Sequence, residues 1–226
     1  MKRGKKYTEN AKKYKPGNTY ELNEAITLVK TMAYAKFDET VELSVKLNLK
    51  KSQSIRDTVV LPHQFRGEKK VLVFCKAEKE KEAQEAGATF IGAEDLIEKI
   101  KGGWTDFDVA VATPDMMKDV GKLGMILGRK GLMPNPKTGT VTFDLKGTLA
   151  ELKKGRVEFR ADKTGVMHLA VGKVSMEPEK VVENVKVVIT EVRRKRPVDV
   201  KGEFIQSVSV ASTMGPGVWV ALRDQE

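Results

Sequence analysis

Residues 36–50, KFDETVELSVKLNLK, carry the pattern that decides the fold. Every second residue from Phe37 to Leu49 is apolar, with Glu39 as the only exception, and the intervening positions are polar throughout. Side chains on a β-strand alternate between two faces, whereas a helix would scatter the same residues around its circumference. The stretch is therefore predicted to be a long strand with one buried face and one polar face.

The polar face of this strand has two possible roles. It can simply face water, as one face of an antiparallel sheet commonly does, or it can be a docking surface. The pattern of the strand alone leaves both roles open, so the rest of the chain has to decide between them.

The charge of the chain points to a polyanionic partner. Its 226 residues include 41 Lys and Arg against 31 Asp and Glu, a formal net charge of +10. Most of the excess lies at the two ends, because residues 1–66 carry a net +7 and residues 156–226 a net +2, whereas residues 67–155 carry a net +1. This balance favours nucleic acid as a partner without proving it.

The number of cysteines and the distribution of apolar residues indicate in which compartment the protein is expected. A single cysteine, Cys75, excludes an internal disulfide framework and is typical of a reducing cytoplasm. No apolar run approaches the length of a membrane span, and no apolar stretch follows the basic N-terminus as it would in a secretory signal. We therefore expect a cytoplasmic protein with no membrane contact.

The two ends of the chain predict antiparallel strands and two helices. The helices are expected at about residues 24–34, capped by Asn23, and at 179–194. Besides residues 36–50, strands are expected at residues 58–61, 156–161, 166–171, 204–211 and 218–222. The turn DKTG (162–165) predicts a hairpin between 156–161 and 166–171, and STMGPG (212–217) joins the last two strands.

The middle of the chain alternates short apolar strands with helices. Strands are expected at 71–75, 89–91 and 107–112, and helices at 79–86, 94–101, 114–125 and 145–154. This alternation is typical of a parallel sheet covered on both faces. The predicted fold is α/β with two domains: a split α+β antiparallel-sheet domain formed by both termini, residues 1–66 and 156–226, and an inserted Rossmann-like α/β/α domain, residues 67–155.

Catalytic chemistry finds little support in the sequence. The first βα turn, Cys75–Lys79, lacks the glycines that let a backbone approach phosphate, and there is no Walker pattern. His63, His168 and one cysteine do not provide the spacing of a metal site, and no residue pattern marks a nucleophile. We expect no catalytic residues, no cofactor and no metal, and a hydrolase or dehydrogenase is the weaker alternative.

Two loops have compositions that are unusual for simple connections. LGMILGRKGLMPNPKTGTVT (123–142) is either a rigid connection or a functional loop, and its length favours function. In STMGPG (212–217), hydroxyls can bond phosphate or ribose, glycines allow close approach, and Met214 offers a soft apolar surface. A turn with only structural duties remains the alternative for this second loop.

Six segments together resemble one known family along essentially the whole chain. They are KFDETVEL (36–43), LPH (61–63), ATPDMM (112–117), LGMILGRKGLMPNPKTGTVT (123–142), DKTG (162–165) and STMGPG (212–217). In this order they resemble the bacterial large-subunit ribosomal protein L1 family, the protein of the mobile stalk. The resemblance implies a non-enzymatic protein whose split domain binds large-subunit rRNA and whose stalk contacts departing exit-site tRNA. It also implies repression of translation from its own operon mRNA, and a monomer off the ribosome.

The resemblance also implies RNA contacts at matching positions. Phe37 would stack or wedge, Thr40 and Thr213 would hydrogen-bond ribose or phosphate, and Glu42 would orient its neighbours or accept from a 2′-OH. The full set of RNA-binding positions is Lys36, Phe37, Thr40, Glu42, Lys163, Ser212, Thr213, Met214, Gly215 and Gly217, with Lys163 expected near the turn.

Three departures from the family pattern limit this transfer. Gly128–Gly131 reads GRKG where the family has Gly-Pro-Arg-Gly, Gln64-Phe65 stands where it tends to have glycine, and residues 48–57 differ from its usual acidic-proline connection. Two other functions remain alternatives: a regulatory RNA-binding module that never joins a ribosome, and a nucleotide-dependent enzyme that uses the middle domain.

Overall fold

The computed structural model describes residues 4–50, 53, 55–67 and 69–221. The chain divides into two compact units: unit 1 comprises Met1–Phe65 and Val157–Glu226, and unit 2 comprises Arg66–Arg156. Lys51, Ser52 and Ser54 of the segment 48–57, which departs from the family pattern, and Leu222 at the end of a predicted strand, lie outside the described residues. The predicted mixed α/β fold is confirmed.

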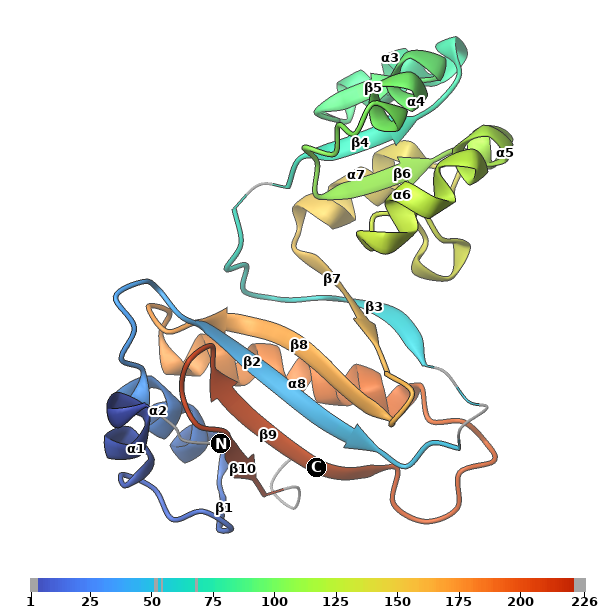
Figure 1. The fold of residues 1–226 in the computed structure, drawn as a ribbon. Helices are drawn as coiled ribbons and strands as arrows, with labels where there is room; N and C mark the ends of the chain where they lie inside the picture. Colours follow the sequence, from blue (N-terminus) through green and yellow to red (C-terminus); the bar gives the residue numbers. More distant parts are fainter. Residues whose placement is uncertain (1–3, 51–52, 54, 68, 222–226) are drawn as a thin grey trace. The chain divides into compact units, whose positions relative to one another are not determined.

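The main sheet of unit 1 has five strands in the order β1-β10-β9-β2-β8 (Figure 1). Strand β1 is parallel to β10, and every other neighbouring pair is antiparallel. The strands are β1 (Thr19–Tyr20), β2 (Thr40–Leu47), β8 (Val166–Lys173), β9 (Ile205–Ser212) and β10 (Val218–Val220). The sheet therefore joins both ends of the chain, with β2 between β8 and β9.

Strand β2 is shorter than the predicted strand at residues 36–50. Its alternate residues Val41, Leu43, Val45 and Leu47 are buried as the pattern predicts. Phe37 precedes the strand and is 57% exposed, so its prediction as the first residue of the buried face is wrong. The strand covers only Thr40–Leu47, so the apolar alternation of the sequence, from Phe37 to Leu49, extends beyond it at both ends.

Two helices pack on the apolar face of this sheet. Apolar residues of α2 (Leu22–Met32) and α8 (Pro178–Arg194) form one core with the buried residues of β2, and Figure 1 shows α8 behind β2 and β8. The predicted cap at Asn23 is wrong, because the helix already begins at Leu22, whose buried side chain belongs to the core. A further short helix, α1 (Lys5–Ala11), precedes β1.

The predicted hairpin around residues 162–165 forms only in part. Strand β7 (Arg156–Arg160) pairs with β3 (Arg56–Val60) in a separate two-stranded sheet, whereas β8 belongs to the main sheet. A single bridge between Ala161 and Met167 joins the two strands beside the turn. The turn signal was correct, but β7 pairs with β3 elsewhere in the chain.

Unit 2 is a three-layer α/β/α arrangement. Three parallel strands in the order β5-β4-β6 form its sheet: β4 (Val71–Phe74), β5 (Phe90–Gly92) and β6 (Val109–Ala112). Helix α4 (Glu94–Lys101) packs on one face, and α3 (Ala77–Glu85) and α7 (Leu145–Lys153) on the other. All four residues of β4 are buried, as expected for a strand covered on both faces.

The predicted helix at 114–125 is divided into short pieces. These are η1 (Pro114–Met116), α5 (Met117–Val120), η2 (Gly121–Leu123) and α6 (Gly124–Arg129), and a further turn, η3 (Pro136–Thr138), lies in the following loop. The breaks coincide with Gly121 and Gly124, and glycine costs about 1 kcal/mol relative to alanine inside a helix. Apolar periodicity alone did not reveal these breaks.

Candidate nucleic-acid interface

The start of β2 and the end of β9 are joined at one end of the main sheet. The Thr213 backbone N–H donates to the Thr40 carbonyl at 3.1 Å, and the Thr40 N–H donates to Thr213 Oγ1 at 3.0 Å. These bonds join residues 173 positions apart in the sequence. We define the tip as residues 34–40 together with residues 212–217. It contains eight of the predicted RNA-contact residues: Lys36, Phe37, Thr40, Ser212, Thr213, Met214, Gly215 and Gly217.

Two large apolar side chains are exposed at the tip. Phe37 is 57% exposed and Met214 is 48% exposed. Their segments are connected directly, because the Tyr34 hydroxyl donates to the Met214 carbonyl at 3.1 Å. The tip thus presents an aromatic ring and a thioether beside hydroxyl groups, a combination that suits the faces of bases and sugars.

Basic side chains add positive charge to the same region. Lys36 is exposed. Lys173, the last residue of β8, donates through Nζ to Thr40 Oγ1 at 3.0 Å and to the Asp38 carbonyl at 3.2 Å. Lys173 was missed from the sequence because only the pairing of β8 with β2, Thr40 opposite Lys173, brings it to the tip.

Glu39 is the second residue that sequence reasoning did not assign to the site. Only 1% of its surface is exposed, and its carboxylate accepts backbone N–H groups of Tyr34, Ala35 and Met214. Burial alone would raise its pKa, but the hydrogen bonds from those N–H groups and the influence of the Ser212 hydroxyl together hold the pKa below its ordinary value of 4.5. The break in the apolar alternation at this position was the available signal.

The two glycines of STMGPG have different surroundings. A Cβ on Gly215 would overlap Ser212 Oγ, whereas a Cβ on Gly217 would meet nothing within 4 Å. Ser212 is buried, and its Oγ has no partner of normal hydrogen-bond geometry among the described residues. A side chain at Gly215 would therefore force Ser212 to shift, whereas Gly217 leaves open space beside the turn.

Lys163 does not lie at the tip. Its turn is at the other end of β2, where the Leu47 N–H donates to the Gly165 carbonyl at 2.8 Å. Leu47 is seven residues from Thr40, and at the rise of a β-strand this places the two residues roughly 20 Å apart. The expectation that Lys163 is near the turn at 212–217 is wrong.

Glu42 lies on the polar face of the sheet, two residues beyond Thr40 and on the same side of the strand. It is exposed, and its cross-strand neighbours are Ala170 on β8 and Ala211 on β9. Two small neighbours leave the carboxylate accessible. Further along the same face, Ser44 Oγ and His168 Nδ1 are 2.9 Å apart.

In the part of unit 2 that the structure describes, the loop 123–142 is held by hydrogen bonds of its own and of Arg156. In the loop 123–142, Asn135 caps η3 by accepting the Lys137 N–H at 2.8 Å, and Arg156 donates to the Thr138 carbonyl at 2.8 Å. These bonds support the rigid-connection interpretation of that loop. Burial raises the pKa of the Cys75 thiol, as expected for a cysteine within the core.

Among residues 4–50, 53, 55–67 and 69–221, no group of three His, Cys, Asp or Glu side chains could hold a metal ion. Within the same residues, no helix has both the length and the apolar character needed to cross a bilayer.

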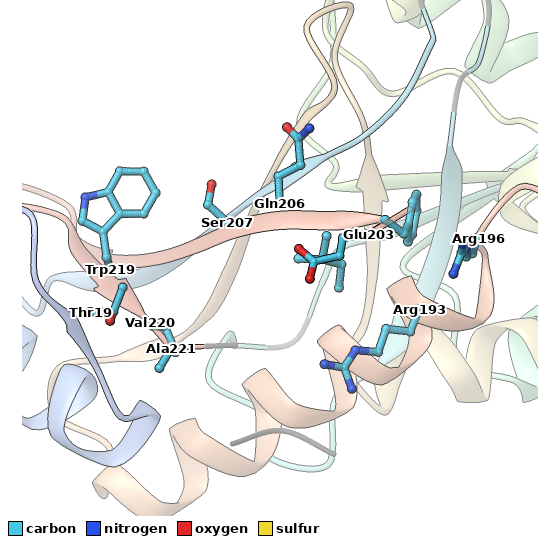
Figure 2. A pocket seen from close by; sticks show the side chains of 11 residues that line it. Thr19, Arg193, Arg196, Glu203, Gln206, Ser207, Trp219, Val220 and Ala221 are labelled. Carbon is cyan, nitrogen blue, oxygen red and sulfur yellow. The ribbon is translucent and has the colours of Figure 1, made fainter. Parts of the chain in front are cut away.

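A cavity of about 890 Å³ lies away from the tip, beside the first residues of β9 and the end of β10. Figure 2 shows Trp219, Ser207 and Gln206 on one side of these strands and Arg193 on the side of α8. Arg196, also in the lining, donates to the Val200 and Gly202 carbonyls and so supports a loop. No predicted RNA-contact residue lines this cavity, so it is separate from the tip.

Comparison with known proteins gives a consistent result. The sequence model of the "Ribosomal protein L1p/L10e family" matches residues 29–216. Similar proteins named "Large ribosomal subunit protein uL1" come from Treponema denticola, 66% identical over 220 residues and 97% of each chain, and Treponema pallidum (strain Nichols), 59% identical over 226 residues and 100% of each chain. Another, from Borrelia hermsii, is 57% identical over 217 residues, 96% of this chain and 97% of the relative. The chain therefore belongs to the ribosomal protein L1p/L10e family.

Proposed function

We propose that this chain is a structural, non-enzymatic protein of the large ribosomal subunit that binds large-subunit rRNA at the mobile stalk through the tip of unit 1. Its family and the printed names of its relatives support the ribosomal role. The observation that carries the assignment to the tip is the pairing of Thr40 with Thr213, because it fixes exposed Phe37 and Met214 at one end of the sheet.

The groups at the tip match what a folded RNA displays. Helical RNA is recognised through its shape, 2′-hydroxyls and phosphates, and unstacked bases pack on aromatic rings. Phe37 would stack on a base, Lys36 and Lys173 would face phosphates, and Glu42 would accept from a 2′-OH. Met214 would cover a sugar or the edge of a base.

The two threonines contribute in different ways. Thr40 Oγ1 accepts from Lys173 and keeps its own proton free to donate to a ribose or phosphate oxygen. Thr213 Oγ1 accepts from the Thr40 N–H and lies 3.3 Å from the Thr40 carbonyl. Thr213 therefore fastens the turn, and its remaining lone pair is available to accept from a 2′-OH.

We also propose two further RNA partners for this chain. Because recognition by shape and 2′-OH groups does not depend on a long base sequence, a similar fold in its own operon mRNA would occupy the same tip and repress translation. In the assembled subunit, the stalk that holds this protein would contact exit-site tRNA and assist its release. Off the ribosome, the chain would be a cytoplasmic monomer.

Footprinting tests the proposal directly. Purified protein is added to large-subunit rRNA, and hydroxyl-radical cleavage should be reduced within one compact region of RNA structure. An unlabelled fragment of the operon mRNA should remove that protection in competition. Protection spread evenly over the rRNA would contradict specific binding, and a specific footprint that the mRNA fails to displace would contradict only the regulatory role.

A further inference from the structure

Glu39 connects three segments of unit 1 at the tip: its own segment 34–40, the residue after β8, and the turn after β9. Its Oε1 accepts the N–H groups of Tyr34 at 2.9 Å and Ala35 at 2.8 Å, and its Oε2 accepts the N–H of Met214 at 3.0 Å. Its backbone carbonyl accepts the Val174 N–H at 2.9 Å. One buried side chain therefore holds the segment after α2 and the turn after β9, which are 175 residues apart.

The three groups that bond the Glu39 side chain are all donors. An ionised carboxylate offers only acceptors and can satisfy them from both oxygens. A glutamine offers one oxygen and one NH₂ group, so an amide hydrogen would face an N–H either at Met214 or at Tyr34 and Ala35. The site therefore requires a carboxylate, and glutamine of the same shape cannot replace it.

We propose that Glu39 is a positioning residue for RNA binding, which sets the backbone of Met214 and of residues 34–37 without itself touching RNA. The inference rests on the proposed function. It adds a buried residue to the exposed residues of the tip. Its burial, at 1% exposed, keeps it out of direct contact, whereas Phe37 and Met214 beside it are exposed.

The position of Glu39 separates this role from general support of the fold. The pairing of β2 with β9 runs from Val41 opposite Ser212 to Leu47 opposite Ile205, and it does not use the Glu39 side chain. The core formed by α2, α8 and the sheet is likewise apolar. Loss of the carboxylate should therefore loosen residues 34–37 and 213–215 and leave the sheet paired.

The test compares the full-length Glu39→Gln variant with wild type. Amide hydrogen exchange should become faster at Met214 or at Tyr34 and Ala35, while amides in the middle of β2 remain protected. Affinity for a fragment of large-subunit rRNA that contains the footprinted region, called the rRNA fragment below, should fall about tenfold. This is the effect expected from leaving one buried donor without its acceptor. The slope of affinity against salt should not change, because no phosphate contact is removed.

A matched control is needed because removing a negative charge by itself strengthens RNA binding. Glu203→Gln provides it: Glu203 is exposed, precedes β9 at the end opposite the tip, and loses the same charge. Its affinity should be equal to or slightly above that of wild type. Glu39→Asp keeps two acceptor oxygens on a shorter side chain, so its affinity should lie between those of wild type and Glu39→Gln.

The outcomes distinguish the inference from the proposed function. Unchanged affinity in Glu39→Gln, with wild type binding normally, would overturn the positioning role alone. Exchange that becomes faster throughout unit 1, or a loss as large in Glu203→Gln, would also overturn it, by showing a general effect on stability or charge. A wild-type protein that does not bind the rRNA fragment would overturn the proposed function itself, and the inference with it.

Discussion

Glu39 shows how much the tip depends on single residues buried beneath its surface. The surface of the tip consists of side chains that contact solvent, but its backbone is held by one carboxylate and by the hydroxyl of Thr213. Removing the Glu39 carboxylate should cost more than removing an exposed carboxylate, because the N–H donors that it would leave behind are partly buried.

The low pKa of Glu39 predicts a pH-dependent contribution to stability. Because its folded-state pKa lies below the ordinary value of 4.5, the ionised side chain stabilises the fold above about pH 4.5, and this contribution is lost as the pH falls through the folded-state pKa. Urea unfolding at pH 7 should show wild type more stable than Glu39→Gln. The difference should shrink on acidification to about pH 3, and a difference independent of pH would contradict the structural account of this carboxylate.

The two glycines of the turn should respond differently to alanine. Gly215→Ala places a methyl group against Ser212 Oγ and should lower the free energy of unfolding by about 1 kcal/mol, as overpacking does. Gly217→Ala meets open space and should stay within about 0.5 kcal/mol of wild type. Thermal unfolding of both variants, and of Ser212→Ala with Gly215→Ala, checks this. The double variant should recover part of the loss, and equal effects of the two glycine changes would contradict the packing described.

At the scale of elements, buried polar groups decide how helices and connecting segments attach to the sheet. Asn184 of α8 is fully buried, and its Nδ2 donates to the Val171 carbonyl of β8 at 2.8 Å and to the His63 carbonyl at 2.9 Å. Its Oδ1 accepts the His63 N–H at 3.0 Å. One amide thus attaches the segment after β3 to the edge of the main sheet.

Replacing this amide should destabilise unit 1. Asn184→Ala leaves three backbone groups without their partner, and we expect a loss of roughly 2–4 kcal/mol in the free energy of unfolding. Asn48→Ala is the matched control, because its amide makes only two long bonds of 3.4 Å at an exposed position. A similar small loss in both variants, measured by urea unfolding, would show that Asn184 does not hold the segment.

The elements that the sequence predicted well are those whose pattern is local. Helix α4 has the predicted bounds 94–101, because its apolar spacing and the glycine that follows it are both local signals. Residues 114–129 and the supposed hairpin of β7 with β8 were misjudged, since glycine breaks and the choice of a strand partner depend on the rest of the fold. The same limit applies at the tip: the break at Glu39 is visible in the sequence, but its partner Met214 is not.

At the scale of the whole molecule, charge and fold divide in the same way. The terminal segments that form unit 1, the unit that contains the tip, carry a net +7 of the +10, whereas residues 66–156, which form unit 2, carry a net +3. Family resemblance indicated residues at the tip from both segments, but not Lys173 or Tyr34, which only the strand register and the backbone path bring there. Long-range attraction to RNA should therefore originate in unit 1.

Salt dependence tests this division of charge. Affinity for the rRNA fragment should fall linearly on logarithmic axes as salt rises, because phosphate contacts release counterions. Lys36→Gln at the tip should lower the slope by about 1. Lys137→Gln, an equally exposed cation in unit 2, should leave the slope unchanged. Equal changes in both slopes would show that the charge of unit 1 has no special part in binding.

We propose that the tip, where distant parts of the chain meet, is the RNA-binding surface. The most direct measurement is the affinity of Met214→Asp for the large-subunit rRNA fragment, beside Val198→Asp as the control. Both residues are exposed apolar side chains of unit 1, 48% and 101% exposed, and both variants gain the same negative charge, but Val198 lies outside the tip. We expect at least a hundredfold loss of affinity for Met214→Asp, roughly 2.7 kcal/mol, and little change for Val198→Asp. Equal affinities in the two variants would contradict it.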